Sequence, residues 1–184
     1  MDSKEYLNLV SELINRLDPD ALNQATEVIL TAMRNGNRIF VAGNGGSAAT
    51  ANHFAADFSK NVVKGDENRP KVMSLNCNMS SVTAYANDEG YENAFSRQLT
   101  NWMESNDVLI VISASGNSPS VVKAAELAHK RGGKVIAMTG FSGGKLREIC
   151  DVSLHADDKY YETIEDIHSV FCHCLVSVIK SEFQ

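Results

Sequence analysis

The chain has 184 residues, the size of one domain, and its 43% hydrophobic and 22% charged residues are ordinary for a globular protein. Its formal net charge of −6 argues against a surface that follows nucleic-acid phosphates, so local donors would have to hold an anionic ligand. No stretch approaches the roughly 18 apolar residues of a membrane-spanning helix, and the polar amino terminus does not resemble a signal peptide. We therefore expect a cytoplasmic protein with reduced cysteines that binds neither membranes nor nucleic acid directly.

Two amphipathic helices are expected over residues 4–17 and 19–35, because apolar residues recur there at intervals of three and four. Pro19 and its flanking aspartates mark the break between them. Beyond these helices, runs rich in Val and Ile alternate with helical segments. The strands are expected over residues 38–46 (ending in a glycine turn), 71–76, 107–115, 134–140 and 151–156, and the helices over 47–61, 79–88, 91–104, 118–132, 143–150 and 161–182.

This alternation is typical of the α/β class, in which a parallel sheet is covered by helices on both faces. We predict a three-layer α/β/α sandwich with five parallel strands, similar to the flavodoxin and Rossmann folds. No interdomain linker or internal repeat appears, so residues 1–184 are expected to form a single domain. Within it, residues 37–184 would form the α/β core, and the helical pair at 1–36 would serve oligomer packing.

The first candidate binding loop follows the first strand and reads Gly43-Asn44-Gly45-Gly46-Ser47-Ala48. Glycines let the backbone approach an anion, and the helix that follows offers free N–H groups and the positive end of its dipole. The loop does not match the dinucleotide fingerprint G-x-G-x-x-G, because Ala48 stands at its sixth position. A turn that merely packs the strand on the helix remains the alternative.

The second loop follows the third strand and contains three hydroxyl groups, those of Ser113, Ser115 and Ser118. Pro119 suits a first helical turn, so Ser118 by itself could be an N-cap, but capping does not explain the other two serines. Ligands of open parallel sheets bind beyond the carboxyl ends of the strands. The two loops therefore predict one phosphate group held by both.

Both loops, together with the segment Asn87-Asp88-Glu89-Gly90-Tyr91, resemble the sedoheptulose-7-phosphate isomerases, also called phosphoheptose isomerases, of the sugar-isomerase (SIS) domain family. The resemblance extends from the N-terminal helices to the last helix. It implies a phosphorylated sugar as substrate. The substrate-binding residues that it implies are Asn44, Gly45, Gly46, Ser47, Asp88, Ser113, Ser115, Ser118 and Glu165.

The resemblance also implies a catalytic and metal-binding set on two helices. His53 and Asp57 lie four residues apart, on one face of the helix after the first loop. The implied zinc ligands are His53, Asp57, Glu165 and His173, with one ion per active site, and the implied catalytic residues are Asp57 and His173. Glu165 and His173 are separated by roughly 12 Å of helix rise. Because one ion would scarcely reach both on one helix, we expect active sites shared between subunits, and the resemblance implies that these subunits form a homotetramer.

The chain departs from the family pattern at four positions. The family has glutamate where Asp57 stands, glutamine at Glu165, aspartate at Glu162 and arginine at Asn61. Asp57 keeps a carboxylate but is shorter by one methylene, which would misplace a proton-transfer group unless something compensates. The added charge of Glu165 would suit a divalent cation.

The activity that the resemblance implies is isomerisation of sedoheptulose 7-phosphate to D-glycero-D-manno-heptose 7-phosphate, used for surface-polysaccharide heptose. Asp57 would move a proton between C1 and C2, and His173 would serve the carbonyl and hydroxyl oxygens. Two alternatives stay open. The change at Asn61 leaves room for another sugar phosphate, and the changes at Asp57 and Glu165 leave room for a non-catalytic regulator of the type that binds the replication initiator DnaA. The retained carboxylate of Asp57 favours the isomerase.

Overall fold

A computed structural model describes residues 1–183 and contains the predicted five-stranded parallel sheet. Its strand order is β2-β1-β3-β4-β5. The strands are β1 (Arg38–Gly43), β2 (Lys71–Ser74), β3 (Val108–Ser113), β4 (Lys134–Gly140) and β5 (Val152–Ala156). β1 pairs with both β2 and β3 in parallel register, so the chain reverses its direction of winding between β1 and β3. In open α/β sheets, this switch point is where ligands bind.

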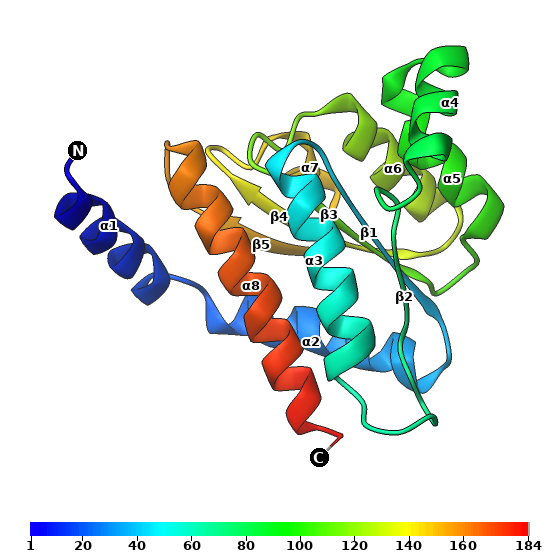
Figure 1. The fold of residues 1–184 in the computed structure, drawn as a ribbon, viewed down its shortest axis with the longest axis horizontal. Coiled ribbons are helices and arrows are strands. Elements are labelled where there is room, and N and C mark those ends of the chain that lie inside the picture. The colour runs from blue at the N-terminus through cyan, green and yellow to red at the C-terminus, as the bar shows by residue number, and fades with distance from the viewer. Residues whose placement is uncertain (184) are drawn as a thin grey trace.

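The helices cover both faces of the sheet, as predicted for a three-layer sandwich (Figure 1). Those before and after β1 are α1 (Ser3–Asn15), α2 (Pro19–Arg34) and α3 (Gly46–Asn61). Those after β2 are α4 (Met79–Glu89), α5 (Ala94–Trp102), α6 (Pro119–Lys130), α7 (Gly144–Ile149) and α8 (Tyr161–Ser181), with a 3₁₀ turn, η1, at Tyr91–Asn93.

Local sequence signals explain several of the helix boundaries. Asp2 and Glu5 form a reciprocal capping box at the start of α1, and Asp18 caps α2 with Pro19 in its first turn. The segment expected as one helix over 91–104 instead begins as η1 and continues as α5. Gly90, at φ +91°, precedes this turn. A left-handed residue cannot continue a right-handed helix, so α4 ends there.

Successive residues of the central strands point to opposite faces and enter two separate hydrophobic clusters. Ile110 and Ile136 pack with α2, α3 and α8 on one face. Leu109 and Val111 pack with α5, α6 and α7 on the other. All four are fully buried, which is why β3 and β4 are apolar on both faces. The second N-terminal helix, α2, thus shares the core of the sandwich.

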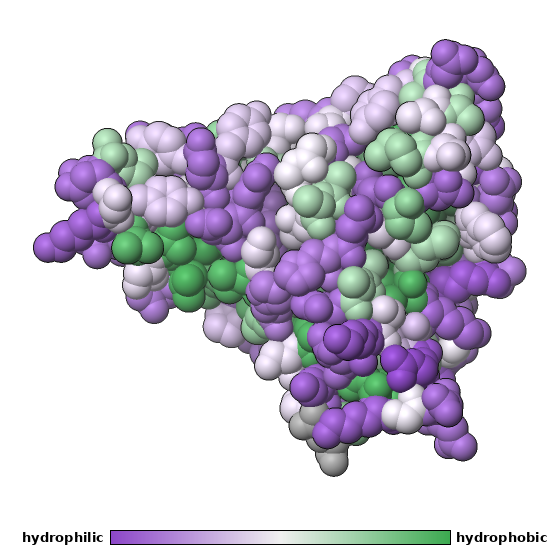
Figure 2. Space-filling view, viewed as in Figure 1, coloured by the Kyte–Doolittle hydropathy of each residue, from purple (hydrophilic) through white to green (hydrophobic). Residues whose placement is uncertain are grey.

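The first helix, α1, differs from the rest because it projects from the body of the molecule (Figure 1). Its side chains Leu7 and Ile14 are 67% and 43% exposed, and Figure 2 shows apolar atoms gathered along this projecting part. An amphipathic helix that leaves part of its apolar stripe in water has a surface suited to a protein partner. None of the described helices combines the length and the apolarity needed to cross a lipid bilayer.

A buried histidine of α8 makes the stability of the fold sensitive to pH. His168 is 1% exposed and stacks on Phe171 with ring centroids 6.5 Å apart. Neither ring nitrogen has a hydrogen-bond partner among the described residues. Burial disfavours the imidazolium form and lowers the pKa of His168 from 6.5 to about 4. The folded chain therefore holds this histidine neutral.

Between pH 6.5 and 4, the unfolded chain binds a proton at His168 that the folded chain does not, so stability falls as the pH falls. We expect this one group to cost roughly 3 kcal/mol of unfolding free energy over that range. Urea titrations at several pH values measure it, with His168→Leu as the comparison. The variant should lose much less stability on acidification, and parallel curves for the two proteins would contradict the assignment.

Candidate active site

The first predicted loop lies at the carboxyl end of β1, and close packing fixes its conformation. A Cβ atom on Gly43 would stand 2.5 Å from the Ser47 carbonyl oxygen, so only glycine fits there. The side chain of Asn76, which follows β2, forms two hydrogen bonds with the backbone of Gly43. The Gly43 N–H donates to Asn76 Oδ1 over 3.1 Å, and Asn76 Nδ2 donates to the Gly43 carbonyl over 2.8 Å. The loop is therefore held from both the helix side and the sheet side.

The second loop, after β3, is held against the start of α7. Gly116 has φ +64°, and a Cβ atom there would lie 1.8 Å from the Gly143 carbonyl oxygen. The Gly116 carbonyl accepts a hydrogen bond from the Leu146 N–H over 2.9 Å. The Asn117 N–H donates to Ser115 Oγ over 3.2 Å, while Asn117 Oδ1 accepts from the Lys145 N–H over 2.9 Å. These contacts fix the backbone that presents the serines.

The two loops meet around one small cavity of about 130 Å³. The structure brings together five predicted substrate-binding residues of these loops and adds Glu165 and Tyr161 from the first turns of α8. The residues that line the cavity are Asn44, Ser47, Ile112, Ser113, Ala114, Ser115, Ser118, Tyr161 and Glu165. Gly45 and Gly46 form the turn that leads into α3.

Two helices, α3 and α6, begin at this cavity. At the start of α3, the N-cap Gly45 offers no side-chain cap, and at the start of α6, Ser118 makes no capping hydrogen bond. The first N–H groups of a helix are left without intrahelical partners and carry the positive end of the dipole. Hydroxyl groups combined with two such helix ends suit a phosphate group.

Asn44 at the cavity wall is held by hydrogen bonds at both ends of its amide. Its Nδ2 donates to Ser120 Oγ over 2.9 Å, and its Oδ1 accepts from the Tyr91 hydroxyl over 2.6 Å. The side chain is thus oriented by α6 on one side and by η1 on the other. An asparagine fixed in this way can present one remaining amide hydrogen and one oxygen lone pair to a ligand.

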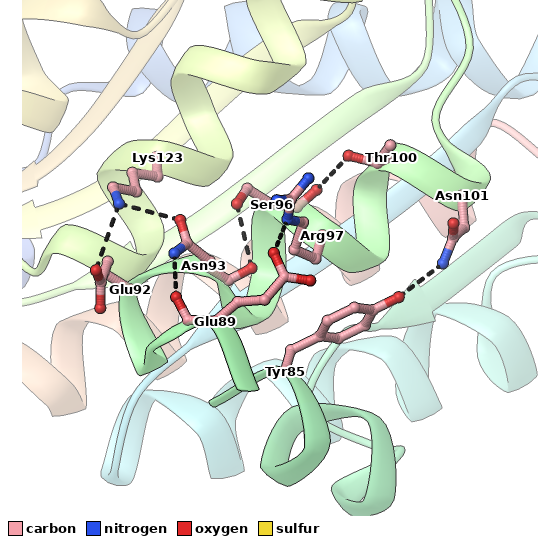
Figure 3. A network of polar contacts seen from close by, with 9 residues as sticks. All are labelled: Tyr85, Glu89, Glu92, Asn93, Ser96, Arg97, Thr100, Asn101 and Lys123. Atoms are coloured by element: carbon pink, nitrogen blue, oxygen red, sulfur yellow. Dashed lines mark hydrogen bonds and ion pairs between the residues drawn. The ribbon is translucent and has the colours of Figure 1, made fainter. Parts of the chain in front are cut away.

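A polar network secures the segment that carries Tyr91 (Figure 3). Lys123 of α6 donates to Asn93 Oδ1 over 3.0 Å and lies 3.6 Å from Glu92 Oε1. Asn93 Nδ2 in turn donates to the Glu89 carbonyl over 2.6 Å, and Arg97 contacts the Glu89 carboxylate. The end of α4, η1 and the start of α5 are thereby tied to α6. Asp88, predicted to touch the sugar, lies exposed on α4 and is not among the residues that line the cavity.

The predicted acid–base residues gather on the outer face where α3 and α8 run side by side (Figure 1). The carboxylate oxygen Asp57 Oδ2 lies 3.3 Å from His53 Nε2 and 3.8 Å from His173 Nε2. The two imidazole rings are 5.2 Å apart in an edge-on arrangement. The other carboxylate oxygen, Oδ1, accepts from Asn61 Nδ2 over 3.3 Å. Asn61 therefore fixes the orientation in which Asp57 faces both histidines.

The geometry of this cluster suits a zinc ion. One ligand atom from each of His53, Asp57 and His173 lies within 4.8 Å of the other two. Ligand atoms around a tetrahedral zinc ion are roughly 3.4 Å apart, and two imidazoles with one carboxylate form a common ligand set. Glu165 is not part of this group and lies at the serine cavity instead. Burial raises the pKa of the neighbouring Cys172 thiol to about 12, with a further rise from the charge of Asp57, so this thiol is protonated in the metal-free protein.

Comparison with known proteins identifies this arrangement. The SIS domain family model matches residues 5–140, so fold and paired loops are those of a SIS domain. A phosphoheptose isomerase from Aliarcobacter butzleri (strain RM4018) is 35% identical over 182 residues, covering 97% of this chain and 95% of the relative. A probable phosphoheptose isomerase from Thermoplasma acidophilum is 36% identical over 184 residues, and the alignment covers 100% of this chain and 100% of the relative.

The solved structures similar to this fold include further phosphoheptose isomerases. The structure of the phosphoheptose isomerase from Neisseria gonorrhoeae has a TM-score of 0.88 and 34% identity, covering 97% of this chain and 94% of that chain. That of a phosphoheptose isomerase from Francisella tularensis has a TM-score of 0.85 and 31% identity, covering 98% and 100%. The chain belongs to the phosphoheptose isomerase family, and the family and fold predicted from the sequence are confirmed.

Three polar residues that line or support the site were not predicted from the sequence. Tyr161 lines the cavity, Ser120 orients Asn44, and Asn76 clamps the glycine loop. Asn76 follows a strand at the sheet edge where ligands bind, and this position was a usable signal. Tyr161 and Ser120 carry no such signal, because their roles depend on contacts between elements far apart in the sequence.

Proposed function

We propose that this protein isomerises sedoheptulose 7-phosphate to D-glycero-D-manno-heptose 7-phosphate. The names of its relatives support the isomerase class and a phosphoheptose substrate. The single observation that carries the proposal is the meeting of four predicted serines at one cavity between two helix N-termini. This arrangement, called here the phosphate cradle, consists of Ser47, Ser113, Ser115 and Ser118 with the starts of α3 and α6.

The isomerisation needs a group that moves a proton between C1 and C2, and a group that serves the two oxygens. Asp57 is the proposed base, and the amide of Asn61 holds it so that its Oδ2 faces His53 and His173. His173 is the proposed partner of the carbonyl and hydroxyl oxygens. In this chain, the hydrogen bond from Asn61 orients the carboxylate of Asp57.

The residues His53, Asp57 and His173 would hold a zinc ion, and a bound divalent cation stabilises the negative charge that develops on the oxygens during enolisation. Glu165 would complete such a site only by contribution from another subunit, because in the described chain it lies at the phosphate cradle.

The distance along α3 between Ser47 of the phosphate cradle and the proposed base Asp57 supports active sites that are shared between subunits. Ser47 and Asp57 are ten residues apart, roughly 15 Å of helix rise. An extended seven-carbon sugar phosphate spans on the order of 10 Å from C1 to phosphorus. We therefore propose that the phosphate cradle of one subunit works with the Asp57 cluster of another, in a homotetramer to which the exposed face of α1 contributes. A fully active monomer in sedimentation experiments would contradict this sharing.

A change in the cradle tests the phosphate assignment directly. Ser118→Ala should weaken binding of sedoheptulose 7-phosphate about tenfold or more, because a hydrogen bond to a charged group is lost. Its effect on stability should be small, since Ser118 makes no capping bond. Calorimetric titration measures the affinity, and Ser80→Ala, at an exposed serine in the first turn of α4, is the matched control. Equal affinity for sedoheptulose without its phosphate would contradict the proposal.

A further inference from the structure

The carboxylate of Glu165 lies directly over the first turn of α3. Its two oxygens lie 2.5 and 2.9 Å from the point that a Cβ atom of Gly46 would occupy, so the glycine makes room for the carboxylate. The same side chain lines the phosphate cradle beside Ser47 and Ser118. Glu165 thus places a negative charge at the phosphate cradle, the site proposed to bind an anionic group.

The surroundings of Glu165 explain why a carboxylate rests there. The side chain is partly buried, and it forms no ion pair with any described residue. Partly burying an unpaired charge is costly unless polar groups compensate for the lost water. The nearest helix end is the start of α3, whose N-cap Gly45 makes no side-chain cap, so the positive end of the helix dipole lies beside the carboxylate.

The small volume of the cavity would bring a bound phosphate close to Glu165. The cavity measures about 130 Å³ with Glu165 and Tyr161 on its wall. Sites for small organic ligands usually measure about 300–1,000 Å³. The cavity is therefore of a size for the phosphate group alone, with the Glu165 carboxylate on its wall. Glu165 has three rotatable side-chain bonds, so its carboxylate can turn away from the cavity without a shift of α8.

We propose that Glu165 is a displaceable carboxylate that lines the phosphate cradle in the free protein and turns away from it when a phosphate monoester binds. The inference rests on the proposed function, because it takes the cradle to be the phosphate site. Glu165 thereby lowers the affinity for phosphate alone, and only ligands with further contacts to the site recover the loss. A neutral residue of the same shape would bind phosphate more tightly.

The experiment titrates inorganic phosphate into the full-length protein, without added metal and at low ionic strength, for wild type and Glu165→Gln. We expect the variant to bind phosphate about tenfold more tightly. Because the effect is electrostatic, raising the salt concentration should narrow the difference. Glu165→Asp, which keeps the charge, should stay close to wild type. Glu126→Gln, an equal charge change at an exposed position of α6, is the matched control and should change nothing.

Equal or weaker phosphate binding by Glu165→Gln would overturn the displacement proposal, as would an equal gain in Glu126→Gln. The companion variant Ser118→Ala separates this failure from failure of the proposed function. If Ser118→Ala loses phosphate affinity but Glu165→Gln gains none, the cradle binds phosphate and only the role of Glu165 is wrong. If no variant binds phosphate, or Ser118→Ala binds it as wild type does, both proposals fail.

Discussion

Replacing Asp57 by asparagine is expected to lower kcat for sugar-phosphate isomerisation by about 10³-fold. The substitution keeps the shape of the side chain but removes the proton acceptor, and general acid–base groups contribute typically about 10² to 10⁴ in rate. His173→Ala should cause a loss of the same order, because its Nε2 lies 3.8 Å from Asp57 Oδ2 and it is the proposed partner of the oxygens next to the carbons that Asp57 serves. A coupled turnover assay with sedoheptulose 7-phosphate measures both.

The control for these variants is Asp66→Asn, which removes a carboxylate from the exposed loop that follows α3. All three proteins should unfold at similar urea concentrations, since His53, Asp57 and His173 are at least partly exposed. An Asp57→Asn enzyme that keeps more than a tenth of the wild-type kcat would show that another group moves the proton.

Gly116→Ala is expected to cause the largest loss of stability in the site, about 3–5 kcal/mol, together with loss of sugar-phosphate binding. The new Cβ atom would stand 1.8 Å from the Gly143 carbonyl oxygen, so the serine loop or the start of α7 must move. The left-handed backbone of residue 116, at φ +64°, adds strain for any residue that has a Cβ.

Gly65→Ala separates these two causes. Gly65 is also left-handed, at φ +85°, but no atom lies within 4 Å of its would-be Cβ. We expect this control to lose only about 1 kcal/mol and to bind substrate normally. Urea titration and calorimetric binding measure both variants. Similar losses in the two variants would mean that the contact between Gly116 and Gly143 does not hold the serine loop.

Most of the fold was predictable from the sequence because the buried strands carry a strong local signal. Residues such as Ile110 and Leu109 follow one another in an apolar run, which is typical of a parallel strand covered on both faces. The break at Gly90 was harder to predict, since the glycine was visible but its left-handed conformation was not. The projection of α1 from the body also depends on tertiary packing, which periodicity does not report.

The candidate site was predicted where its residues share a loop or a helix face. The cradle serines and the pair His53 and Asp57 are local patterns, and the structure brings each set together. The position of Glu165 was not predictable in the same way. On the sequence it belonged equally to the sugar and to the metal, and only the packing of α8 on α3 places it at the cradle. Asp88 lies outside the cavity of the single chain, and its contact with the sugar stays a prediction.

Proton NMR of sedoheptulose 7-phosphate incubated with the protein in D₂O tests the central claim most directly. We predict that an aldose signal appears with deuterium incorporated at C2, because a proton carried by Asp57 exchanges with solvent before it returns to the sugar. The wild-type protein should do this and Asp57→Asn should not. A substrate spectrum that stays unchanged with the folded wild-type protein, with and without zinc, would contradict isomerisation of this sugar by the site described.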